Sequence, residues 1–525
     1  MKKWKLNLNP WNIEAYLEFI NSKLSRRGFW LSWLIVLGTV CLIHLLTFKI
    51  SPPLWVDEAQ IIEHGRLIPF EPNSEWSMNW WSAANRPILL WSYLGPALQE
   101  TAFRITAPLP FGPRIASLFG AMIAATASVG WLLSMKTYRP IALILGLVFF
   151  LDYIFVQSYR GARVDCWVLA FCFGACWVVR YAMSRMQEGR PFRWLLTIGG
   201  SMAAIAFFVW PSAVLTYPLL LAELLVLIRE EYSIRKSGAS ILRSVMAFVT
   251  SGLVTTSLLL IPIWHLLKTV FNDIEPVLRA SQPPYSLSLQ IKNLLDSFKF
   301  SQLLPVSALI GFIWGRGRIM AWMALLVFVY ILSTLLYLNR LIYLLPYAIG
   351  LIGGVYQIPS TLMANAKTRR LITHVGLSLV IVASVSLSLI IRPAIALSQR
   401  GERDPSILFS LGRESIGSGP YRVYLGAWEF YFVGRWFGWQ MLNEYADRDQ
   451  RDLSRLLSRA DHAIFRLGDV DNNLAAQLST AGLYLQKELT DDRQHQMDMK
   501  QQVRLGARAY GPYVLYSRQL ASEGQ

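Results

Sequence analysis

The sequence predicts a polytopic α-helical membrane protein with about 11 transmembrane helices, followed by a small external α/β domain at the C-terminal side. Three observations support this fold class. The composition is 54% apolar and only 16% charged, which is unusual for a soluble enzyme. Apolar runs of nearly membrane-spanning length follow one another up to residue 392. Beyond that residue the chain becomes polar and carries basic and acidic residues in equal number.

Eleven apolar runs approach the roughly 20 residues that cross a bilayer as a helix. The runs lie at about 29–48, 113–134, 139–157, 165–183, 194–210, 211–229, 244–267, 301–314, 319–337, 341–359 and 371–391. The run at 301–314 is short, and only Trp210-Pro211 separates the fifth run from the sixth. The exact number of spans is therefore less well supported than the conclusion that this number is odd. No small-residue cleavage pattern follows the first run, which therefore predicts a retained anchor.

Basic residues predict the orientation of these helices. We place residues 1–28 in the cytoplasm as an arm along the membrane surface, because every short connection on that side is then basic, as the positive-inside rule requires. These connections contain Lys136 and Arg139; Arg180, Arg185, Arg190 and Arg193; Arg229, Arg235, Lys236 and Arg243; Arg316 and Arg318; and Lys367, Arg369 and Arg370. Counting 87–105 as a further span would invert every later loop. We therefore expect 87–105 to form a helix in the outer interface or to be partly re-entrant.

This orientation divides the rest of the chain into two parts. Residues 29–392 form the transmembrane domain and carry two long external loops, 49–112 and 268–300. The odd number of spans places residues 393–525 outside as well, and their alternation of strand-like and helical stretches predicts an α/β domain. The strand-like runs are 421–425, 462–467 and 513–517.

The distribution of charge argues against a nucleic-acid partner. The chain has 50 basic and 33 acidic residues, but residues 393–525 contain 16 of each, which leaves 34 basic against 17 acidic residues before them. The basic surplus therefore belongs to the membrane domain, where it marks cytoplasmic loops rather than a basic soluble face. The four cysteines all lie in apolar runs, so they predict no disulfide framework, and we assign them no chemistry.

Two adjacent carboxylates, Asp57 and Glu58, follow the first span on its external side. A structural interpretation is helix capping, with Asp57 as the N-cap residue and Glu58 in the first turn, where the helix dipole favours acids. A functional interpretation is a general base, because a carboxylate beside a lipid phosphate can take a proton from an attacking hydroxyl. The two interpretations are compatible, since a capping position fixes the geometry of the side chain.

A second charged cluster occupies the tight external turn between the third and fourth predicted spans. Asp165 opens the fourth span there, on the same side of the membrane as Asp57. Arg160 and Arg163 precede it in the turn. They could hold a phosphate leaving group, or they could pair with Asp165 and with Asp152 in the third span.

Two further arginines are predicted to lie near the outer headgroups. Arg86 precedes the interfacial stretch, and Arg340 precedes a late apolar run. An arginine at a helix end is often an anchor whose charged group reaches the headgroups. Here, however, all the candidate acids and arginines fall on the external side, whereas the cytoplasmic loops are basic and contain almost no acids. We therefore expect any chemistry to be external.

The external motifs form an ordered set that is similar to a known family. Their order is Asp57-Glu58, Arg86-Pro87-Ile88-Leu89-Leu90, Gly112-Pro113-Arg114-Ile115-Ala116-Ser117-Leu118, Arg163-Val164-Asp165 and Arg340…Tyr343…Pro346. This set resembles the GT-C glycosyltransferases, in particular the group that contains protein O-mannosyltransferases and the lipid A aminoarabinose transferase. The resemblance covers about residues 29–190 and then thins to the late arginine motif and the general plan of an external C-terminal domain.

The resemblance implies a GT-C-like fold and a transferase that uses a polyprenyl-phosphate-linked sugar as its donor. By this resemblance Asp57 is the base toward the acceptor hydroxyl, Glu58 supports it, and Asp165 is the second acidic position. Arg86, together with Arg163 or Arg340, would neutralise the lipid phosphate as it leaves. The location implied is the outer face of a bacterial inner membrane.

The resemblance also bears on mechanism and cofactors. Polyprenyl phosphate is already a good leaving group, so direct displacement with inversion needs a base and cations but no nucleotide-binding loop. Some relatives carry an acid as a metal ligand where this chain has Asn85. That departure argues against a bound divalent cation, for which His64 and His265 are the remaining candidate ligands.

Two other classes of protein stay open. A glycolipid transporter or flippase would be expected to show charges near the middle of its spans or broken helices in related halves, whereas here the acids gather at one edge. A non-catalytic envelope assembly partner would tolerate Asp57→Asn. If the chain is a transferase, its acceptor is open between a protein, a lipid and a polysaccharide.

Overall fold

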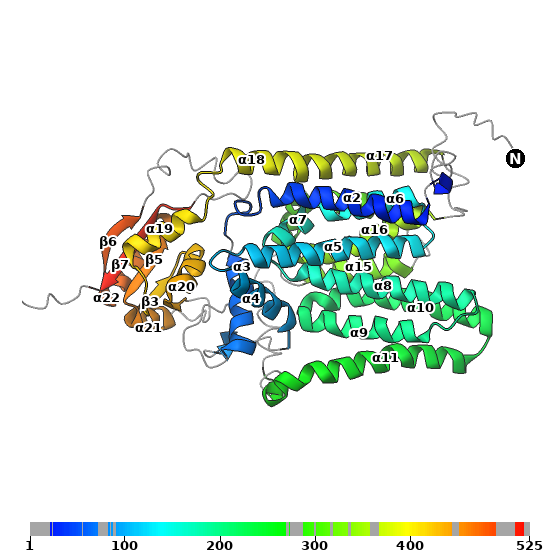
Figure 1. Cartoon of the computed structure of the whole chain (residues 1–525), viewed down its shortest axis with the longest axis horizontal. Coiled ribbons are helices and arrows are strands. Elements are labelled where there is room, and N and C mark those ends of the chain that lie inside the picture. Colours follow the sequence, from blue (N-terminus) through cyan, green and yellow to red (C-terminus); the bar gives the residue numbers. More distant parts are fainter. Residues whose placement is uncertain are drawn as a thin grey trace, which may run out of the picture.

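The structure, a computed structural model, shows a bundle of long helices with an α/β domain at one end (Figure 1). It describes residues 21–23, 25–54, 56–71, 82–83, 86–87, 91–268, 272, 287–298, 301–314, 319–333, 338–357, 367–443, 451–489 and 510–518. Most of the predicted arm 1–28 and of the predicted loop 268–300 lies outside these ranges. The described part of that loop is mainly α13 (Leu287–Phe298).

Within the described residues, six helical segments are long and apolar enough to cross a membrane. They are α2 (Arg26–Leu45); α5 (Phe111–Ser134); α8 (Asp165–Gln187); η2 (Pro211–Thr216) with α10 (Tyr217–Arg235); α11 (Gly238–Leu260) with η3 (Ile261–Leu266); and α17 (Lys367–Val385) with η5 (Ser386–Ile391) and α18 (Arg392–Ser398). A seventh candidate is the pair α6 (Arg139–Leu151) and α7 (Tyr153–Arg160), which is bent by 56°. The chain therefore has the helices of an integral membrane protein.

The predicted count of 11 spans is not confirmed. Four of the predicted runs form shorter helices: α9 (Arg193–Val209), α14 (Leu303–Trp314), α15 (Ile319–Ser333) and α16 (Leu345–Val355), the last preceded by η4 (Leu338–Leu344). The predicted span 139–157 is interrupted at Asp152, whose backbone is extended and whose carboxylate accepts a hydrogen bond from the Ile154 amide at 3.2 Å. A hydropathy pattern detects apolar runs, but it does not report whether the helix within a run is continuous.

The outer helices of the bundle expose apolar side chains. Only 6% of the most apolar window of the segment Gly238–Leu266 is buried, compared with 61% for α8 at the centre. An apolar surface of this extent is unfavourable in water and is expected where lipid tails surround the protein. The bundle thus consists of central helices packed on protein and peripheral helices that face outward.

Short elements gather at the end of the bundle nearest the α/β domain (Figure 1). They are α3 (Val56–Gly65), the π-helical turn η1 (Arg66–Phe70), the paired strands β1 (Ser82–Ala83) and β2 (Arg86–Pro87), and α4 (Leu94–Thr106). Helix α4 corresponds to the stretch 87–105. Its 13 residues rise about 20 Å, which is less than the roughly 30 Å of a hydrocarbon layer.

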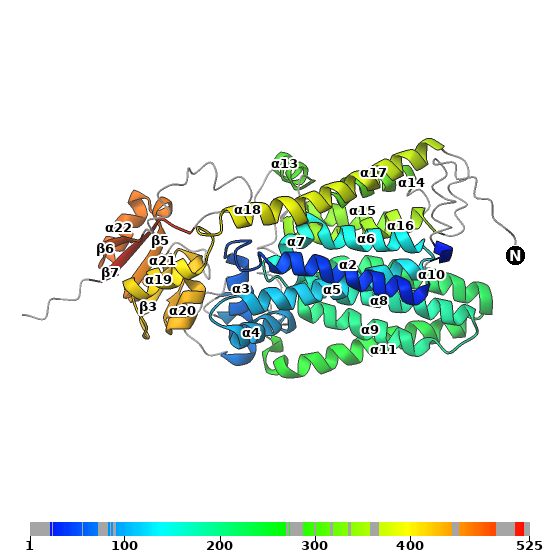
Figure 2. The same ribbon diagram turned by 45° about the horizontal axis from the view of Figure 1, so that its top comes forward.

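The connections α8–α9 and α10–α11 lie at the opposite end of the bundle (Figure 1). The first contains Arg190, and the second contains Lys236, directly after Arg235 at the end of α10. Figure 2 shows α17 and α18 as one long rod that runs from that opposite end to the α/β domain. The two ends of the bundle therefore differ in composition: basic connections at one end, short helices and the α/β domain at the other.

The α/β domain is built on a five-stranded sheet with the order β4-β3-β5-β7-β6. Its strands are β3 (Arg422–Leu425), β4 (Gln440–Leu442), β5 (His462–Arg466), β6 (Leu483–Leu489) and β7 (Tyr513–Arg518). Strand β3 pairs in parallel with β4 and β5, whereas β7 is antiparallel to β5 and β6. Strands β3, β5 and β7 correspond to the three strand-like runs in the sequence.

Helices cover both faces of this sheet. They are α19 (Ser406–Ser415), η6 (Trp428–Phe430), α20 (Tyr431–Phe437), α21 (Arg451–Arg459), η8 (Leu467–Asp469) and α22 (Asn472–Thr480). Side chains alternate along each strand, so Val423 and Leu425 join one apolar cluster while Tyr424 joins the other. The cluster that contains Val423 also contains Ala59 and Ile62 of α3, so the domain packs directly on that helix.

Polar contacts reinforce the packing of the α/β domain on α3 and α4. The Tyr431 hydroxyl donates to Glu63 Oε2 at 2.9 Å, and the Arg435 guanidinium donates to Glu100 Oε1 at 2.8 Å. The Tyr510 hydroxyl accepts from the amide of Leu54 at 3.0 Å. Helix α3 is therefore held between the bundle and the domain, which fixes the position of the acidic residues in its first turn.

Candidate active site

Helix α3 begins at Val56, so Asp57 and Glu58 both lie inside its first turn. The expectation that Asp57 is the N-cap residue is therefore wrong, although the helix dipole still favours both acids there. The two side chains enter different environments. The Asp57 side chain is 21% exposed, whereas that of Glu58 is fully buried.

Asp57 meets Asp165 through a shared arginine. The guanidinium of Arg163 donates to Asp57 Oδ2 through Nη1 and to Asp165 Oδ2 through Nε, the latter at 2.7 Å. The other oxygen of Asp165 accepts a hydrogen bond of 2.5 Å from the Tyr343 hydroxyl. The loop acid and the acid that opens α8 therefore form one cluster, as their common side of the membrane predicts.

The turn before α8 orients Arg163. Ala162, just before it, has a φ of 49°, a left-handed conformation that residues other than glycine adopt rarely. The carbonyl of Arg163 accepts from the Ser117 hydroxyl at 2.8 Å, and that hydroxyl accepts from Gln99 Nε2 at 2.6 Å. Helices α4 and α5 thus hold the backbone that presents the Arg163 guanidinium.

Glu58 forms a separate, closed pair with Arg114 at the start of α5. The Arg114 guanidinium donates twice to Glu58 Oε1, at 2.7 and 3.1 Å, and once to the carbonyl of Phe48 at 2.5 Å. Burial raises the pKa of Glu58 to about 7, although Arg114 opposes the shift, and Asp57 adds to it. Glu58 Oε2 has no hydrogen-bond partner among the described residues. This geometry ties α3 to α5 and leaves Glu58 inaccessible.

Asp57 and Asp165 differ in exposure, and this difference suits them to different roles. Asp165 is 2% exposed and is engaged at both oxygens, so it serves to orient Arg163. Asp57 is the accessible carboxylate of the cluster, and Arg163 is 14% exposed beside it. A base next to a cation, both reachable by a substrate, is the arrangement that proton abstraction and stabilisation of an anionic leaving group require.

Arg160 does not belong to this cluster. It is fully buried and donates five hydrogen bonds, to His44 O and Nδ1, to Thr47 O and Oγ1, and to Ser51 O, at 2.8 to 3.1 Å. Every N–H of its guanidinium is therefore used to hold the end of the first span. The expectations that Arg160 binds the donor phosphate or pairs with an acid do not fit this geometry. Asp152 instead accepts from the Ser301 hydroxyl at 2.8 Å.

The other two candidate arginines lie in different elements. The backbone of Arg86 is in β2, opposite Ala83, and its side chain is outside the described part of the structure. Arg340 is half-buried in η4, three residues before Tyr343, whose hydroxyl reaches Asp165. Arg340 thus belongs to the turn that contacts the cluster, and its role stays a prediction.

The two candidate metal ligands differ in burial. His64 is fully buried in α3, whereas His265 is exposed in η3. Among the residues that the structure describes, no three His, Cys, Asp or Glu side chains come together in a way that could hold a metal ion.

Two residues contact the acids of the site although the sequence analysis did not predict these contacts. Tyr343 was part of the late motif, but nothing in its spacing indicates that it donates to a residue 178 positions earlier. Arg114 was part of the motif that opens the predicted second span. A guanidinium at the edge of an apolar helix is a signal for a buried acidic partner, and that signal could have identified the Glu58–Arg114 pair.

The bundle, the short helices on one end and the α/β domain beyond them form a fold that is also found in solved structures of other proteins. No protein-family model and no curated protein matches the sequence. The similarity is therefore one of structure.

The fold is similar to that of ArnT from Cupriavidus metallidurans. In the structure of ArnT bound to undecaprenyl phosphate, the match has a TM-score of 0.57 at 11% identity and covers 95% of this chain and all of ArnT. The apo structure of ArnT gives a TM-score of 0.53 at 11% identity, with 93% and 98% covered. An oligosaccharyltransferase from Archaeoglobus fulgidus gives 0.46 at 11% identity and covers 86% of this chain.

Proposed function

We propose that the chain is a glycosyltransferase that moves a sugar from a polyprenyl-phosphate donor to an acceptor hydroxyl, with Asp57 as the general base. The observation that carries the proposal is the Asp57–Arg163–Asp165 cluster, in which the accessible carboxylate lies beside a partly exposed guanidinium. The fold shared with ArnT, which has been crystallised with undecaprenyl phosphate, supports the class of donor.

The residues suggest a direct displacement. Asp57 takes the proton of the acceptor hydroxyl, whose oxygen attacks the anomeric carbon while the bond from that carbon to the phosphate oxygen breaks. The electron pair leaves with the polyprenyl phosphate, and the sugar inverts its configuration. Arg163, whose guanidinium donates to Asp57, is the proposed cation for the leaving phosphate, and Arg86 and Arg340 are further candidates. Asp165 and Tyr343 position Arg163.

The proposed reaction takes place at the outer face of a bacterial inner membrane. The basic connections α8–α9 and α10–α11 support a cytoplasmic location for their end of the bundle, because positive loops are retained on that side. The Asp57 cluster and the α/β domain would then both be external, and residues 1–28 cytoplasmic. In this orientation the α/β domain covers α3 from outside and could also contact the acceptor, be it a protein, a lipid or a polysaccharide.

The test is a donor screen with the full-length protein in lipid bilayers. A panel of polyprenyl-monophosphate sugars is incubated with the protein and crude envelope acceptor, and release of polyprenyl phosphate is measured. We expect release from one sugar donor, absence of release with Asp57→Asn, and unchanged release with Asp469→Asn, which alters an exposed acid of the α/β domain. If no donor releases polyprenyl phosphate, the transporter and assembly-partner hypotheses replace this one.

A further inference from the structure

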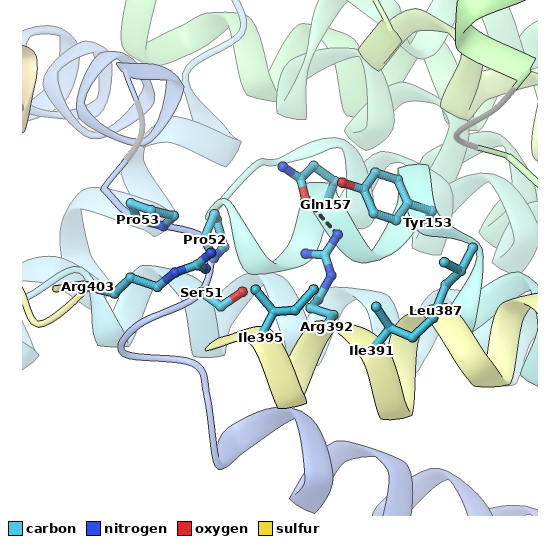
Figure 3. A pocket seen from close by; sticks show the side chains of 10 residues that line it. All are labelled: Ser51, Pro52, Pro53, Tyr153, Gln157, Leu387, Ile391, Arg392, Ile395 and Arg403. Carbon is cyan, nitrogen blue, oxygen red and sulfur yellow. Dashed lines mark hydrogen bonds between the residues drawn. The ribbon is translucent and has the colours of Figure 1, made fainter. Parts of the chain in front are cut away.

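A pocket outside the Asp57 cluster lies between the end of the first span, helix α7 and the last span. Its walls are Ser51 to Pro53, Tyr153 and Gln157 of α7, Leu387 and Ile391 of η5, Arg392 and Ile395 of α18, and Arg403 beyond it. Figure 3 shows Arg403 extending toward Ser51 and Pro52, and Arg392 rising from α18 toward Gln157. The pocket therefore has arginines on two sides and aliphatic side chains along its floor.

The two arginines lack carboxylate partners among the described residues. Arg392 donates to Gln157 Oε1 at 2.9 Å and stacks over the Tyr153 ring at 4.6 Å. Arg403 donates through Nε to Gln399 Oε1 at 2.9 Å. The nearby acid Asp404 pairs with Lys49 at 3.0 Å instead. Glu402 attracts Arg403 electrostatically, but no ion pair forms between them. Two guanidinium groups thus share one pocket without a carboxylate in direct contact among the described residues.

Arg403 gives the more specific signal. It is only 4% exposed, and its Nη2 has no hydrogen-bond acceptor among the described residues. Burying an arginine with unused donors is costly unless an anion completes the site. Burial lowers the pKa of the Arg403 guanidinium, and the like charge of Arg392 acts in the same direction, whereas Tyr510 and Glu402 oppose the shift.

The walls of the pocket indicate the rest of the ligand. Ile391 is 40% exposed and its neighbour Ile390 is 60% exposed, so the aliphatic floor continues onto the outward-facing surface of the last span. A free anion would gain nothing from this surface, whereas a lipid tail would cover it. Guanidinium groups form strong charge-assisted hydrogen bonds with phosphate oxygens, so a lipid phosphate fits the basic side of the pocket.

We propose that the Arg392–Arg403 pocket binds the phosphate group of a lipid, whose tail lies along Leu387, Ile391 and Ile390. The site is separate from the Asp57 cluster. Arg160, which holds the Ser51 carbonyl at 2.9 Å, fixes the wall of the pocket. The proposal goes beyond the transferase reaction and does not depend on it, since it concerns binding alone.

Native mass spectrometry of the full-length protein in detergent tests the proposal. Phosphatidylglycerol, undecaprenyl phosphate, zwitterionic phosphatidylcholine and inorganic phosphate are titrated separately. We expect at least one of the two anionic lipids to bind stoichiometrically, with at least tenfold weaker binding to Arg403→Gln and to the double variant Arg392→Gln/Arg403→Gln. Arg400→Gln removes the same charge from an exposed position of the same segment and is expected to bind like wild type.

The source of the phosphate follows from the same titrations. A preference for undecaprenyl phosphate would identify a carrier lipid, and a preference for phosphatidylglycerol a bilayer lipid; either result supports the pocket. Ile395→Trp, which fills the floor and keeps both arginines, should weaken lipid binding as well and serves if the arginine variants do not fold. Wild-type lipid affinity in Arg403→Gln and Ile395→Trp, or equally tight binding of inorganic phosphate, would overturn the proposal.

Discussion

The first turn of α3 contributes to two charged clusters, one through Asp57 and one through Glu58. These clusters differ in exposure although the two acids are adjacent in sequence. Asp57 is 21% exposed and shares Arg163 with Asp165, whereas Glu58 is fully buried against Arg114. The open cluster can meet a substrate, and the closed pair cannot. A carboxylate near the membrane surface is therefore not catalytic by position alone. Of these two neighbouring acids, Glu58 serves only to join α3 to α5.

The largest expected effect falls on the closed pair. Arg114→Met should lower the free energy of unfolding by about 3–5 kcal/mol, because Glu58 would remain buried without its cation. Thermal unfolding in detergent measures this loss. Arg190→Met, which affects an arginine that is 65% exposed and pairs with the exposed Glu188, is the control and should cost less than about 1 kcal/mol. Equal melting temperatures for the two variants would show that the pair does not hold α3 to α5.

The next effect falls on the bridge of the open cluster. Arg163→Gln should reduce transfer by roughly 100-fold, on the order expected for loss of a charge-stabilising group in an active site. Most of this loss should appear in kcat, and Arg163→Lys should recover part of it because the charge returns without the forked geometry. The measurement is polyprenyl phosphate release in bilayers with correctly folded variants. Unchanged kcat in Arg163→Gln would remove Arg163 from the reaction.

A smaller effect is expected for the hydrogen bond between Tyr343 and Asp165. Tyr343→Phe removes a bond of 2.5 Å to a carboxylate, which is worth about 1.5–3 kcal/mol, and should slow transfer by roughly 10-fold to 100-fold because Asp165 would orient Arg163 less well. Tyr347→Phe is the matched control, since the buried Tyr347 hydroxyl bonds only backbone groups: it donates to the Leu215 carbonyl at 2.8 Å and accepts from the Leu219 amide at 3.1 Å. An equal loss in both variants would indicate a general packing defect.

A further prediction concerns the pH dependence of stability. The pKa of Glu58 is raised by burial from 4.5 to about 7 in the folded protein, so the folded state binds the extra proton more tightly than the unfolded state. Wild-type stability should therefore fall as pH rises from about 4.5 to about 7. Glu58→Gln carries no titrating group and should flatten this slope, measured as melting temperature against pH. Parallel slopes for wild type and variant would show that Glu58 does not titrate in this range.

Much of the site's location could be predicted because charge and hydropathy report sidedness. The basic connections and the acids Asp57 and Asp165 separate along the sequence, and the structure brings these two acids together through Arg163. The α/β character of residues 393–525 was predicted from the alternation of strand-like and helical stretches. The sheet has a strand at each of the three predicted strand-like runs. Both inferences depend on local patterns.

What could not be predicted depends on contacts between distant positions. Arg160 looked like a phosphate ligand because it shares a turn with Arg163, yet it is directed toward carbonyls 109 to 116 residues away. Tyr343 reaches Asp165 across 178 residues. The count of spans depends on where helices break, and Asp152 breaks one inside an apolar run. Hydropathy averages over such positions and so cannot identify them.

A comparison of Asp57→Asn with Glu58→Gln tests the central claim most directly. Each variant replaces one of two adjacent carboxylates by its neutral isostere, and transfer from the active sugar donor is measured in bilayers at pH 7. Loss of a general base predicts a decrease of about 10²–10⁴-fold for Asp57→Asn, while Glu58→Gln should stay within about 10-fold of wild type. Full turnover by folded Asp57→Asn would contradict the assignment of Asp57 as the base.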